Sequence, residues 1–263
     1  MRECLKNILG RISGPAIAVS GGVDSLTLAA VAHGLDKAVV LMHATSPAVP
    51  DEATARVRRL AAERGWRLLV FQAGEFGDAA YRANPVNRCF YCKTNLYGAI
   101  RSRTDRPILS GANLDDLGEY RPGLDAARLY DVRHPYIEAR IGKHTVRQIA
   151  RELGLDDVAE LPSSPCLSSR IETGIRIEPG ALAFIAGVER VVTQEIRPAT
   201  VRCRIRSAGV VIELDAPTLE RLTAAETRRL AALITRQGNR PAGLPVSFER
   251  YRNGSAFLSE PRS

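Results

Sequence analysis

A glycine-rich hexapeptide near the N-terminus has the residue types of a phosphate-binding turn. It reads Ser20-Gly21-Gly22-Val23-Asp24-Ser25 and directly follows an apolar run at 16–19. Glycines let the backbone pass close to a phosphate, and the hydroxyls of Ser20 and Ser25 can donate hydrogen bonds to its oxygens. A helix that begins at this turn would add free N–H groups and the positive end of its dipole. The turn is not a Walker A loop, because no lysine follows the glycines, and its glycine spacing is not that of the GxGxxG dinucleotide motif either.

Two more polar turns are expected after other apolar runs. His43 ends the second run, where an α/β fold of this kind binds adenine. Gly111 and Asn113 follow the fourth run and precede Asp115 and Asp116, whose carboxylates could hold a metal or a ribose. The alternative for the acidic pair is a turn that caps the next helix. For the hexapeptide, the alternative is a glycine-rich turn that binds no ligand. A bare Ser-Gly-Gly would favour that alternative, but the full hexapeptide at the first strand-to-helix turn favours an anion site.

Three cysteines are candidates for metal or redox chemistry. The chain has five cysteines, an odd and sparse set that does not suggest a disulfide scaffold. Cys89 and Cys92 form a CxxC, and Cys166 lies much further along the chain. A structural zinc half-site is the alternative for the CxxC, but a closed zinc site needs four ligands and the nearby sequence offers no pair to complete it. Cys203 is expected to be a buried thiol on a strand, and Cys4 is expected to have no role.

The elements that must position these residues alternate in type through the first two thirds of the chain. Short β-like runs are predicted at 16–19, 38–43, 67–71 and 107–110. Helical patterns are predicted between and after them, at 24–33, 51–64, 93–101 and 144–153. This alternation predicts an α/β fold, with a parallel sheet covered by helices on both faces.

The pattern changes to that of a small α+β domain near residue 177. It predicts a helix through 188, strands at 200–205 and 210–214, a helix at 217–236 and a last strand at 244–248. Because proline and glycine mark the stretch at 173–180, we expect domains at 1–176 and 177–263. In the second domain, Glu189 and Arg204 are expected on a solvated face, with the acceptor site or an oligomer interface as the alternatives.

Composition narrows the class of protein. With 45% apolar and 25% charged residues, the 263-residue chain is predicted to be an ordinary globular protein. No apolar run approaches the roughly 20 residues of a membrane span, and the N-terminus lacks a signal-peptide pattern, so a cytoplasmic location without membrane contact is expected. The net charge of +8 suits an anionic partner, but the arginines are scattered, which favours an anionic small molecule over nucleic acid.

The hexapeptide resembles the PP-loop of the N-type ATP pyrophosphatases, a superfamily that includes GMP synthetase, NAD synthetase and tRNA thiolases. The resemblance implies a Rossmann-like PP-loop domain that splits ATP between the α and β phosphates with the help of Mg²⁺. It makes Asp24 both the Mg²⁺ contact and a catalytic residue. The residues that it assigns to ATP are Ser20, Gly21, Gly22, Asp24, Ser25, His43, Gly111, Asn113 and Arg170.

Three ordered motifs resemble one branch of that superfamily, the LarE family of ATP-dependent sulfur transferases. The motifs lie at 84–97, 111–123 and 165–170. That family adenylylates the carboxylates of a pyridinium-3,5-dicarboxylate mononucleotide and converts them to thiocarboxylates, for the nickel-pincer cofactor of lactate racemase and related enzymes. The resemblance implies the same activity here, with an anionic mononucleotide as substrate, AMP and pyrophosphate as products, and a homo-oligomeric state.

Cys166 stands at the sulfur-delivery position of that family and is therefore expected to be catalytic. One branch gives up the sulfur of this cysteine and leaves dehydroalanine. Another uses three cysteines to hold a [4Fe-4S] cluster that carries an extra sulfide. Cys89 and Cys92 together with Cys166 fit the cluster branch, because three thiolates leave one iron open. We therefore expect these three cysteines to hold a cluster whose extra sulfide comes from a sulfide donor. The open alternative is that Cys166 gives up its own sulfur.

Arginines in the motifs are expected to bind phosphate. Arg170, with Ser169 beside it, and Arg121 are suited to bidentate contacts with the phosphate of the substrate. The chain also departs from the family, which often has a Trp-x-Lys-Pro approach before the Pro-Cys motif. Here that stretch reads Val-Ala-Glu-Leu-Pro at 158–162, so the lysine of that approach is missing.

Two other functions fit part of the pattern. A tRNA 2-thiolation enzyme shares the PP-loop and can also use three cysteines. The chain has no extra cysteine pair, and an aromatic content of 5% does not suggest an RNA-binding platform. A nucleotide-binding regulatory module would keep the phosphate turn without catalysis, but Asp24 and the three cysteines argue against it.

Overall fold

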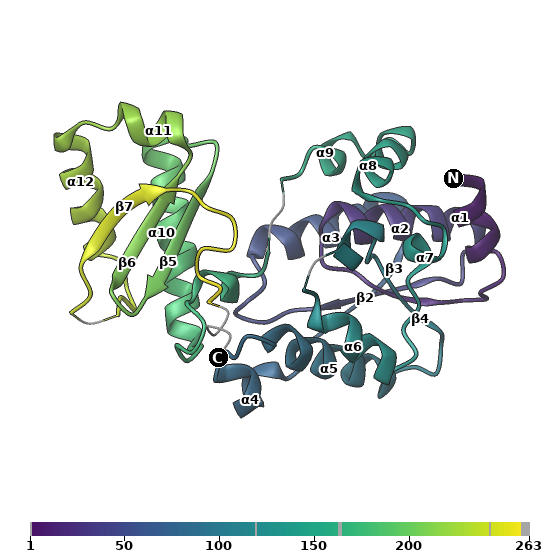
Figure 1. Cartoon of the computed structure of the whole chain (residues 1–263). Helices are drawn as coiled ribbons and strands as arrows, with labels where there is room; N and C mark the ends of the chain where they lie inside the picture. Colours follow the sequence, from purple (N-terminus) through teal and green to yellow (C-terminus); the bar gives the residue numbers. More distant parts are fainter. Residues whose placement is uncertain (1, 119, 163–164, 242, 259–263) are drawn as a thin grey trace. The chain divides into compact units, whose positions relative to one another are not determined.

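The chain forms two compact units, shown in Figure 1. The computed structural model describes residues 2–118, 120–162, 165–241 and 243–258. The first unit comprises Met1–Asp78 and Asn87–Ser164, and the second comprises Ala79–Val86 and Pro165–Ser263. By their contacts, residues 165–176 group with the C-terminal part of the chain. The domain boundary expected at 176/177 stays a prediction.

The first unit is built on a parallel sheet with the strand order β3-β2-β1-β4. Its strands are β1 (Ala16–Ala18), β2 (Val40–Ala44), β3 (Arg67–Phe71) and β4 (Ile108–Ser110). β1 lies between β2 and β4, with Ala16 opposite Val40 on one side and opposite Ile108 on the other. These strands are the four apolar runs of the sequence, so the predicted parallel α/β sheet is confirmed.

Helices cover both faces of the sheet, because successive strand residues point to opposite sides. On one face Ile17, Leu41 and Leu109 share a core with helical residues. The helices on this face are α1 (Arg2–Leu9), α2 (Val23–Leu35), α3 (Asp51–Arg64), α7 (Pro135–Glu138), α8 (Lys143–Glu152) and α9 (Asp156–Ala159). On the other face Ala16 and Val40 pack with α5 (Arg88–Arg101) and α6 (Pro122–Leu129) (Figure 1).

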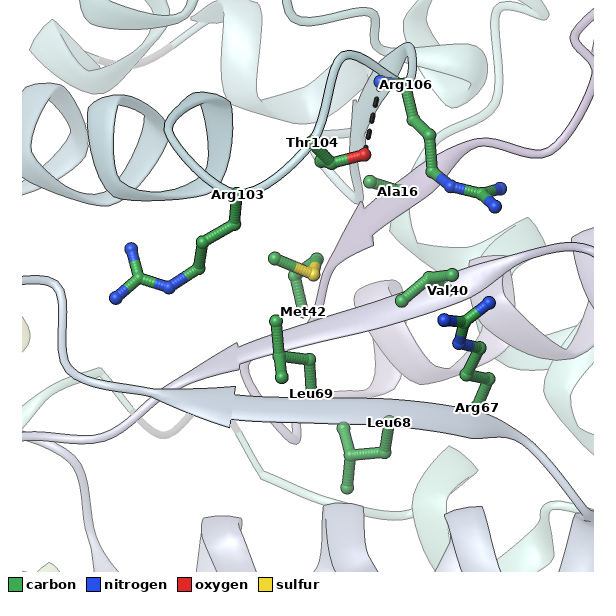
Figure 2. Close-up of a pocket in the computed structure, with 9 residues that line it drawn as sticks. All are labelled: Ala16, Val40, Met42, Arg67, Leu68, Leu69, Arg103, Thr104 and Arg106. Carbon is green, nitrogen blue, oxygen red and sulfur yellow. Dashed lines mark hydrogen bonds between the residues drawn. The ribbon is translucent and has the colours of Figure 1, made fainter.

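A concavity of about 190 Å³ lies on the α5 face, near the amino ends of the strands (Figure 2). Val40, Met42 and Leu69 contribute apolar surface to it, and Arg67 and Arg103 are among its basic residues. Because the strands are parallel, their amino ends lie at the edge opposite to the turn that follows β1. The concavity is therefore not part of the predicted phosphate site.

The second unit is a small α+β structure, as the sequence pattern predicts. β5 (Val201–Arg206) pairs antiparallel with β6 (Gly209–Leu214), which pairs in parallel with β7 (Val246–Arg250). α10 (Pro179–Ile196) packs against β5. The helix predicted at 217–236 is in fact two helices, α11 (Ala216–Arg221) and α12 (Ala224–Thr235). The break arises because Thr223 and Glu226 form a capping box that starts a new helix.

A short segment from the middle of the chain belongs to the second unit. It contains α4 (Ala79–Arg82) and Asn84, whose φ of 55° lies in the left-handed region that asparagine tolerates. The side-chain amide of Asn84 donates to the carbonyls of Glu172 at 2.8 Å and Ile175 at 3.0 Å. The backbone N–H of Gly174 donates to the carbonyl of Asn84 at 2.9 Å. These hydrogen bonds explain why the segment groups with residues after 165.

None of the helices in the described ranges has the length and apolar character that a membrane crossing needs.

Candidate active site

The hexapeptide forms the turn from β1 into α2, as predicted. Gly21 has a φ of +85°, and a Cβ atom there would lie 2.7 Å from the carbonyl oxygen of Ala53. Only glycine fits this position, because both the backbone conformation and the space exclude a side chain. Gly22 is the N-cap residue of α2, and no side chain caps the helix. The first N–H groups of α2 thus lack a side-chain cap where the sequence places the phosphate.

The two serines of the hexapeptide lie together at this turn. The hydroxyl of Ser25 accepts a hydrogen bond from the N–H of Ser20 at 3.1 Å and donates to the carbonyl of Gly22 at 3.2 Å. The two hydroxyl oxygens are 3.3 Å apart. Arg56, which the sequence did not single out, donates from α3 to the carbonyl of Gly21 at 2.8 Å. The hydroxyl groups are therefore positioned by the fold at the N-terminus of α2.

The turn after β4 lies directly against the hexapeptide. A Cβ atom on Gly111 would come within 2.8 Å of the N–H nitrogen of Ser25, so the close approach requires glycine. The side-chain amide of Asn113, which is buried, donates to Oδ1 of Asp24 at 3.3 Å. The structure thus brings Gly111 and Asn113 to Asp24 and Ser25, from a segment almost ninety residues later in the chain.

Asp24 is contacted by two residues that the sequence did not predict. The ammonium group of Lys143, at the start of α8, forms an ion pair with Oδ2 of Asp24. The buried hydroxyl of Tyr136 donates to the backbone carbonyl of Asp24 at 3.1 Å. Burial raises the pKa of Tyr136 well above its ordinary value, and the charge of Asp24 adds to the effect, so this hydroxyl stays protonated. One feature of the sequence could have pointed to Lys143: it is a cation at the start of a predicted helix, where the helix dipole disfavours positive charge.

The acidic pair after Asn113 organises its own loop. Oδ2 of Asp115 accepts a hydrogen bond from the backbone N–H of Lys143 at 2.9 Å and so caps α8. Asp116 accepts from the N–H of Asn113 at 2.9 Å and pairs with Arg121 at 3.0 Å. These contacts favour the capping alternative for Asp115, although the capped helix is not the next one in sequence. The phosphate contact expected of Arg121 stays a prediction.

His43 is buried and uses both ring nitrogens within the first unit. Nδ1 lies 2.8 Å from the carbonyl oxygen of Val19, and Nε2 lies 2.9 Å from the hydroxyl of Thr54. Since a carbonyl can only accept, Nδ1 carries the proton and Nε2 accepts from Thr54. Burial lowers the pKa of His43 and thereby favours this neutral form. His43 thus ties the end of β1 to α3, and its predicted contact with adenine stays a prediction.

In the second unit, Cys166 lies in a loop held by the buried Arg170 and Arg204. Arg170 donates to the carbonyls of Pro165 at 2.7 Å and Cys166 at 3.3 Å, and to the hydroxyl of Ser169 at 2.9 Å. Its guanidinium also pairs with Glu189 at 3.0 Å. The phosphate contacts expected of Ser169 and Arg170 stay predictions, but the guanidinium is already engaged in holding the loop.

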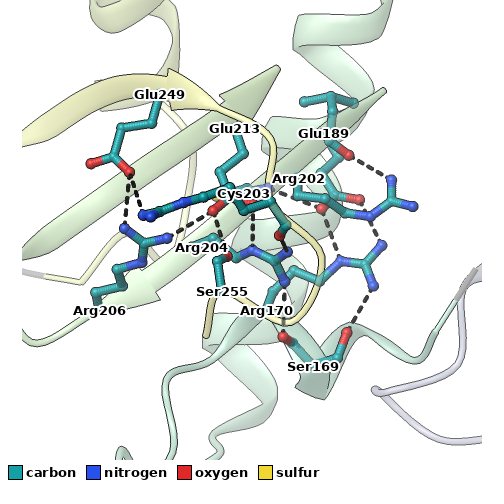
Figure 3. Close-up of polar contacts among 12 residues, drawn as sticks. Ser169, Arg170, Glu189, Arg202, Cys203, Arg204, Arg206, Glu213, Glu249 and Ser255 are labelled. Carbon is teal, nitrogen blue, oxygen red and sulfur yellow. Dashed lines mark hydrogen bonds and ion pairs between the residues drawn. The ribbon is translucent and has the colours of Figure 1, made fainter. Parts of the chain in front are cut away.

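Arg204 and Glu189 do not lie on a solvated face, and that expectation was wrong. Arg204 donates to the carbonyl of Ser169 at 3.0 Å and pairs with the fully buried Glu213 at 2.9 Å. Glu189 also accepts from the backbone N–H of Cys203 at 3.0 Å. Sequence spacing could not show these pairs, because their partners lie on other elements. Together they fix the Cys166 loop to β5 and α10 within the second unit (Figure 3).

The cysteines differ in their surroundings. Cys89 and Cys92 share the first turns of α5, where residues three apart lie on one face, and Cys89 is exposed. Cys92 and Cys166 are half-buried. Cys203 is buried as expected, and burial raises the pKa of its thiol. Among the described residues, no three His, Cys, Asp or Glu side chains form a group that could hold a metal. The cluster expected of Cys89, Cys92 and Cys166 stays a prediction, because the first two cysteines belong to the first unit and Cys166 belongs to the second.

Comparisons with known proteins agree with this architecture. The chain matches no protein-family model. It is 35% identical over 192 residues to an uncharacterized protein of Synechocystis sp., and the match covers 71% of each chain. It is 26% identical over 203 residues to an uncharacterized protein of Methanocaldococcus jannaschii, covering 76% of this chain and 77% of that protein. It is 28% identical over 205 residues to the pyridinium-3,5-bisthiocarboxylic acid mononucleotide synthase of Lactiplantibacillus plantarum, covering 75% of this chain and 73% of the synthase.

The parallel sheet, its helices on both faces and the glycine-rich turn after β1 define a Rossmann-like α/β domain of the PP-loop type, followed by a smaller unit with its own sheet. The relatives then identify the family. The chain belongs to the same family as the Synechocystis protein, and its more distant similarity to the Lactiplantibacillus synthase, an enzyme, supports the LarE family.

Proposed function

We propose that this chain is an ATP-dependent sulfur transferase of nickel-pincer cofactor biosynthesis. It adenylylates the carboxylates of a pyridinium-3,5-dicarboxylate mononucleotide, releases pyrophosphate, and converts the activated carboxylates to thiocarboxylates with release of AMP. The observation that carries the proposal is the convergence of Ser25, Asp24 and Asn113 at the N-terminus of α2. The similarity to the Lactiplantibacillus synthase supports the substrate class.

Mg²⁺ fits this site through Asp24. The carboxylate of Asp24 is one-quarter exposed, and Mg²⁺ commonly binds to one or two carboxylates together with the phosphate oxygens of a nucleotide. Asp24 would hold the ion, and the ion would neutralise part of the negative charge of the phosphates. The side-chain amide of Asn113 keeps the carboxylate oriented through its contact with Oδ1.

The residues of the turn bind and orient ATP in this proposal. The N–H groups at the start of α2 and the hydroxyls of Ser20 and Ser25 bind the phosphates. A carboxylate oxygen of the substrate then forms a bond to the α-phosphorus, and the bond from that phosphorus to the bridging oxygen breaks with its electron pair leaving on pyrophosphate. No proton moves in this step. Its product is an acyl adenylate, in which AMP is a good leaving group.

Cys166 is assigned the sulfur-transfer step. Its thiol is half-buried, and the loop that carries it is held by Arg170 and Arg204. Its thiolate attacks the carbonyl carbon of the acyl adenylate, and AMP leaves with the electron pair of the broken carbon–oxygen bond, which gives a thioester. Removal of the α-proton of Cys166 then breaks its Cβ–Sγ bond, so that the sulfur leaves as the thiocarboxylate and dehydroalanine remains in the chain. The [4Fe-4S] cluster expected of Cys89, Cys92 and Cys166 stays a prediction, and no step is routed through it.

The test is a paired assay of wild type, Asp24→Ala and Cys166→Ala with ATP, Mg²⁺ and the dicarboxylate mononucleotide. Pyrophosphate release and the mass of the pyridinium product are measured in the same reaction. We expect Asp24→Ala to abolish pyrophosphate release, and Cys166→Ala to keep it while losing the thiocarboxylate product. Full sulfur transfer by Cys166→Ala would remove this cysteine from the mechanism. Pyrophosphate release that depends on tRNA instead of the mononucleotide would replace the proposed function by tRNA thiolation.

A further inference from the structure

The ion pair between Lys143 and Asp24 places a cation at the predicted phosphate site. The ammonium group of Lys143 contacts Oδ2 of Asp24, which stands between Gly22 and Ser25 in the glycine-rich turn. The backbone of Lys143 is held at the same place, because its N–H donates to Asp115 at 2.9 Å. Both ends of this lysine are thus tied to residues of the two turns that form the site.

Stability alone does not explain this lysine. Lys143 is the first residue of α8, where the helix dipole disfavours a cation. The side chains of Lys143 and Asp24 are 36% and 25% exposed, and an ion pair that is partly open to solvent contributes little to folding. A cation in an unfavourable helix position, beside an anion-binding turn, is better explained by a negatively charged ligand.

We propose that Lys143 is a second cationic ligand of the ATP phosphates, and that Asp24 holds its ammonium group in place until the nucleotide binds. The inference rests on the proposed function and adds a catalytic residue to it. A lysine has a compact charge on a flexible stem, so its ammonium group can move from a carboxylate to a nearby phosphate oxygen. Asn113 remains on the other oxygen of Asp24 and keeps this carboxylate oriented during the exchange.

The chemical role of Lys143 follows from where charge develops. As the substrate oxygen bonds to the α-phosphorus, the electron pair of the broken bond goes to the bridging oxygen of pyrophosphate. A cation on that group stabilises the transition state more than the ground state. Lys143 neither gives up nor takes a proton in this step. It acts by its charge alone, so an arginine should replace it in part and an uncharged residue should not.

The test uses pyrophosphate itself as the probe and measures its binding by calorimetry in EDTA, without metal or catalysis. The decisive comparison is Asp24→Asn against the double variant Asp24→Asn with Lys143→Met. Asparagine keeps the shape of Asp24 and removes its charge, so Lys143 no longer has a carboxylate to hold. We expect the double variant to bind pyrophosphate about tenfold more weakly than Asp24→Asn, the usual scale for one charge-assisted contact. Lys143→Arg in the Asp24→Asn background should retain most of the affinity.

Lys37→Met is the matched control. Lys37 follows the C-terminal end of α2, and its ammonium group contacts His33 rather than the turn. Removing this charge lowers the net charge of the chain by the same amount, and we expect no change in pyrophosphate binding. Thermal unfolding of every variant shows whether the first unit is folded, and Lys143→Arg keeps the comparison meaningful if Lys143→Met is unstable.

Equal pyrophosphate affinity in the single and double variants would overturn the inference, because Lys143 would then act only through Asp24. Weaker binding in Lys37→Met of the same size would also overturn it, since the effect would come from overall charge. The proposed function fails separately. If pyrophosphate binds through Lys143 but wild type does not adenylylate the dicarboxylate mononucleotide, the lysine assignment stands and the reaction does not.

Discussion

Nε of Arg170 lies 3.0 Å from Oε1 of Glu189, and the same guanidinium donates to the carbonyls of Pro165 and Cys166, which belong to the peptide bonds before and after the loop cysteine. The Arg170 side chain is 3% exposed and that of Glu189 is 16% exposed. This ion pair therefore links α10 to the backbone of the proposed sulfur-transfer residue.

Glu189→Gln is expected to lower the stability of the second unit and to impair sulfur transfer more than adenylylation. Removing one partner of a buried ion pair typically costs about 3–5 kcal/mol, and the exposure of Glu189 places the expected loss near the lower end. Chemical unfolding measures that loss. Because the contacts lie at Cys166, thiocarboxylate formation should fall more than pyrophosphate release. Glu195→Gln is the control, since Glu195 also lies on α10 but pairs with the exposed Arg229 of α12. An equal fall in thiocarboxylate formation and in pyrophosphate release would argue against a role of Glu189 at the cysteine.

Gly111→Ala is expected to damage ATP binding, because the new Cβ would lie 2.8 Å from the nitrogen of Ser25 and 2.9 Å from the carbonyl carbon of Asp24. These are backbone atoms that cannot turn aside, so the hexapeptide itself must shift. Overpacking of this kind costs about 1–3 kcal/mol. Gly118→Ala is the matched control, since nothing lies within 4 Å of a Cβ there. Nucleotide titration of both variants checks the prediction, and unchanged ATP affinity in Gly111→Ala would contradict it.

Stability is expected to fall as the pH drops below about 6.5. Burial lowers the pKa of His43 and of His134 in the folded chain, whereas both titrate near 6.5 when unfolded. Below that pH the unfolded state binds more protons than the folded state, so the free energy of unfolding decreases until the folded histidines also titrate. The slope reaches at most about 1.4 kcal/mol per pH unit for each histidine.

Urea unfolding of wild type and His43→Asn at pH 7.5 and 5.5 measures this effect. Asparagine can still donate to the carbonyl of Val19, so the variant should fold, and its stability should depend less on pH than that of wild type. An identical pH dependence in both proteins would mean that folding does not lower the pKa of His43.

The [4Fe-4S] cluster stays a prediction, and iron binding tests it directly. If Cys89, Cys92 and Cys166 hold a cluster, anaerobic reconstitution should load about four irons per chain with the absorption and EPR spectra of such a cluster. The double variant Cys89→Ala with Cys92→Ala should lose that iron. Cys203→Ser is the control, because that thiol is buried away in the second unit. No iron in wild type would overturn the prediction, and a loss of the mass of H₂S after turnover would then assign the sulfur to Cys166.

Much of the fold could be predicted because its signals are local. Apolar runs such as Arg67–Phe71 identify the strands of a parallel sheet, and the hexapeptide identifies the turn that follows β1. The split between α11 and α12 was missed, although Thr223 and Glu226 have the spacing of a capping box, because the apolar pattern continues across the break.

The site was predicted less completely, because its pairings are long-range. Lys143 lies 119 residues after Asp24, and Glu189 lies 19 residues after Arg170 on a different element. No spacing rule connects residues at such separations. Arg170 was expected at a phosphate from its residue type and its place in the third motif, whereas its buried contacts with the Cys166 loop depend on where α10 packs.

The chain passes from one unit to the other three times, because Ala79–Val86 is built into the second unit while the residues on both sides belong to the first. Asn84 makes this segment dependent on carbonyls at 172 and 175. A truncated chain that ends at residue 164 would therefore carry Ala79–Val86 without its acceptors. For the same reason, exchanging the C-terminal part between two family members replaces only one of the two pieces that build that unit. A working chimera has to exchange 79–86 along with everything from 165 onward.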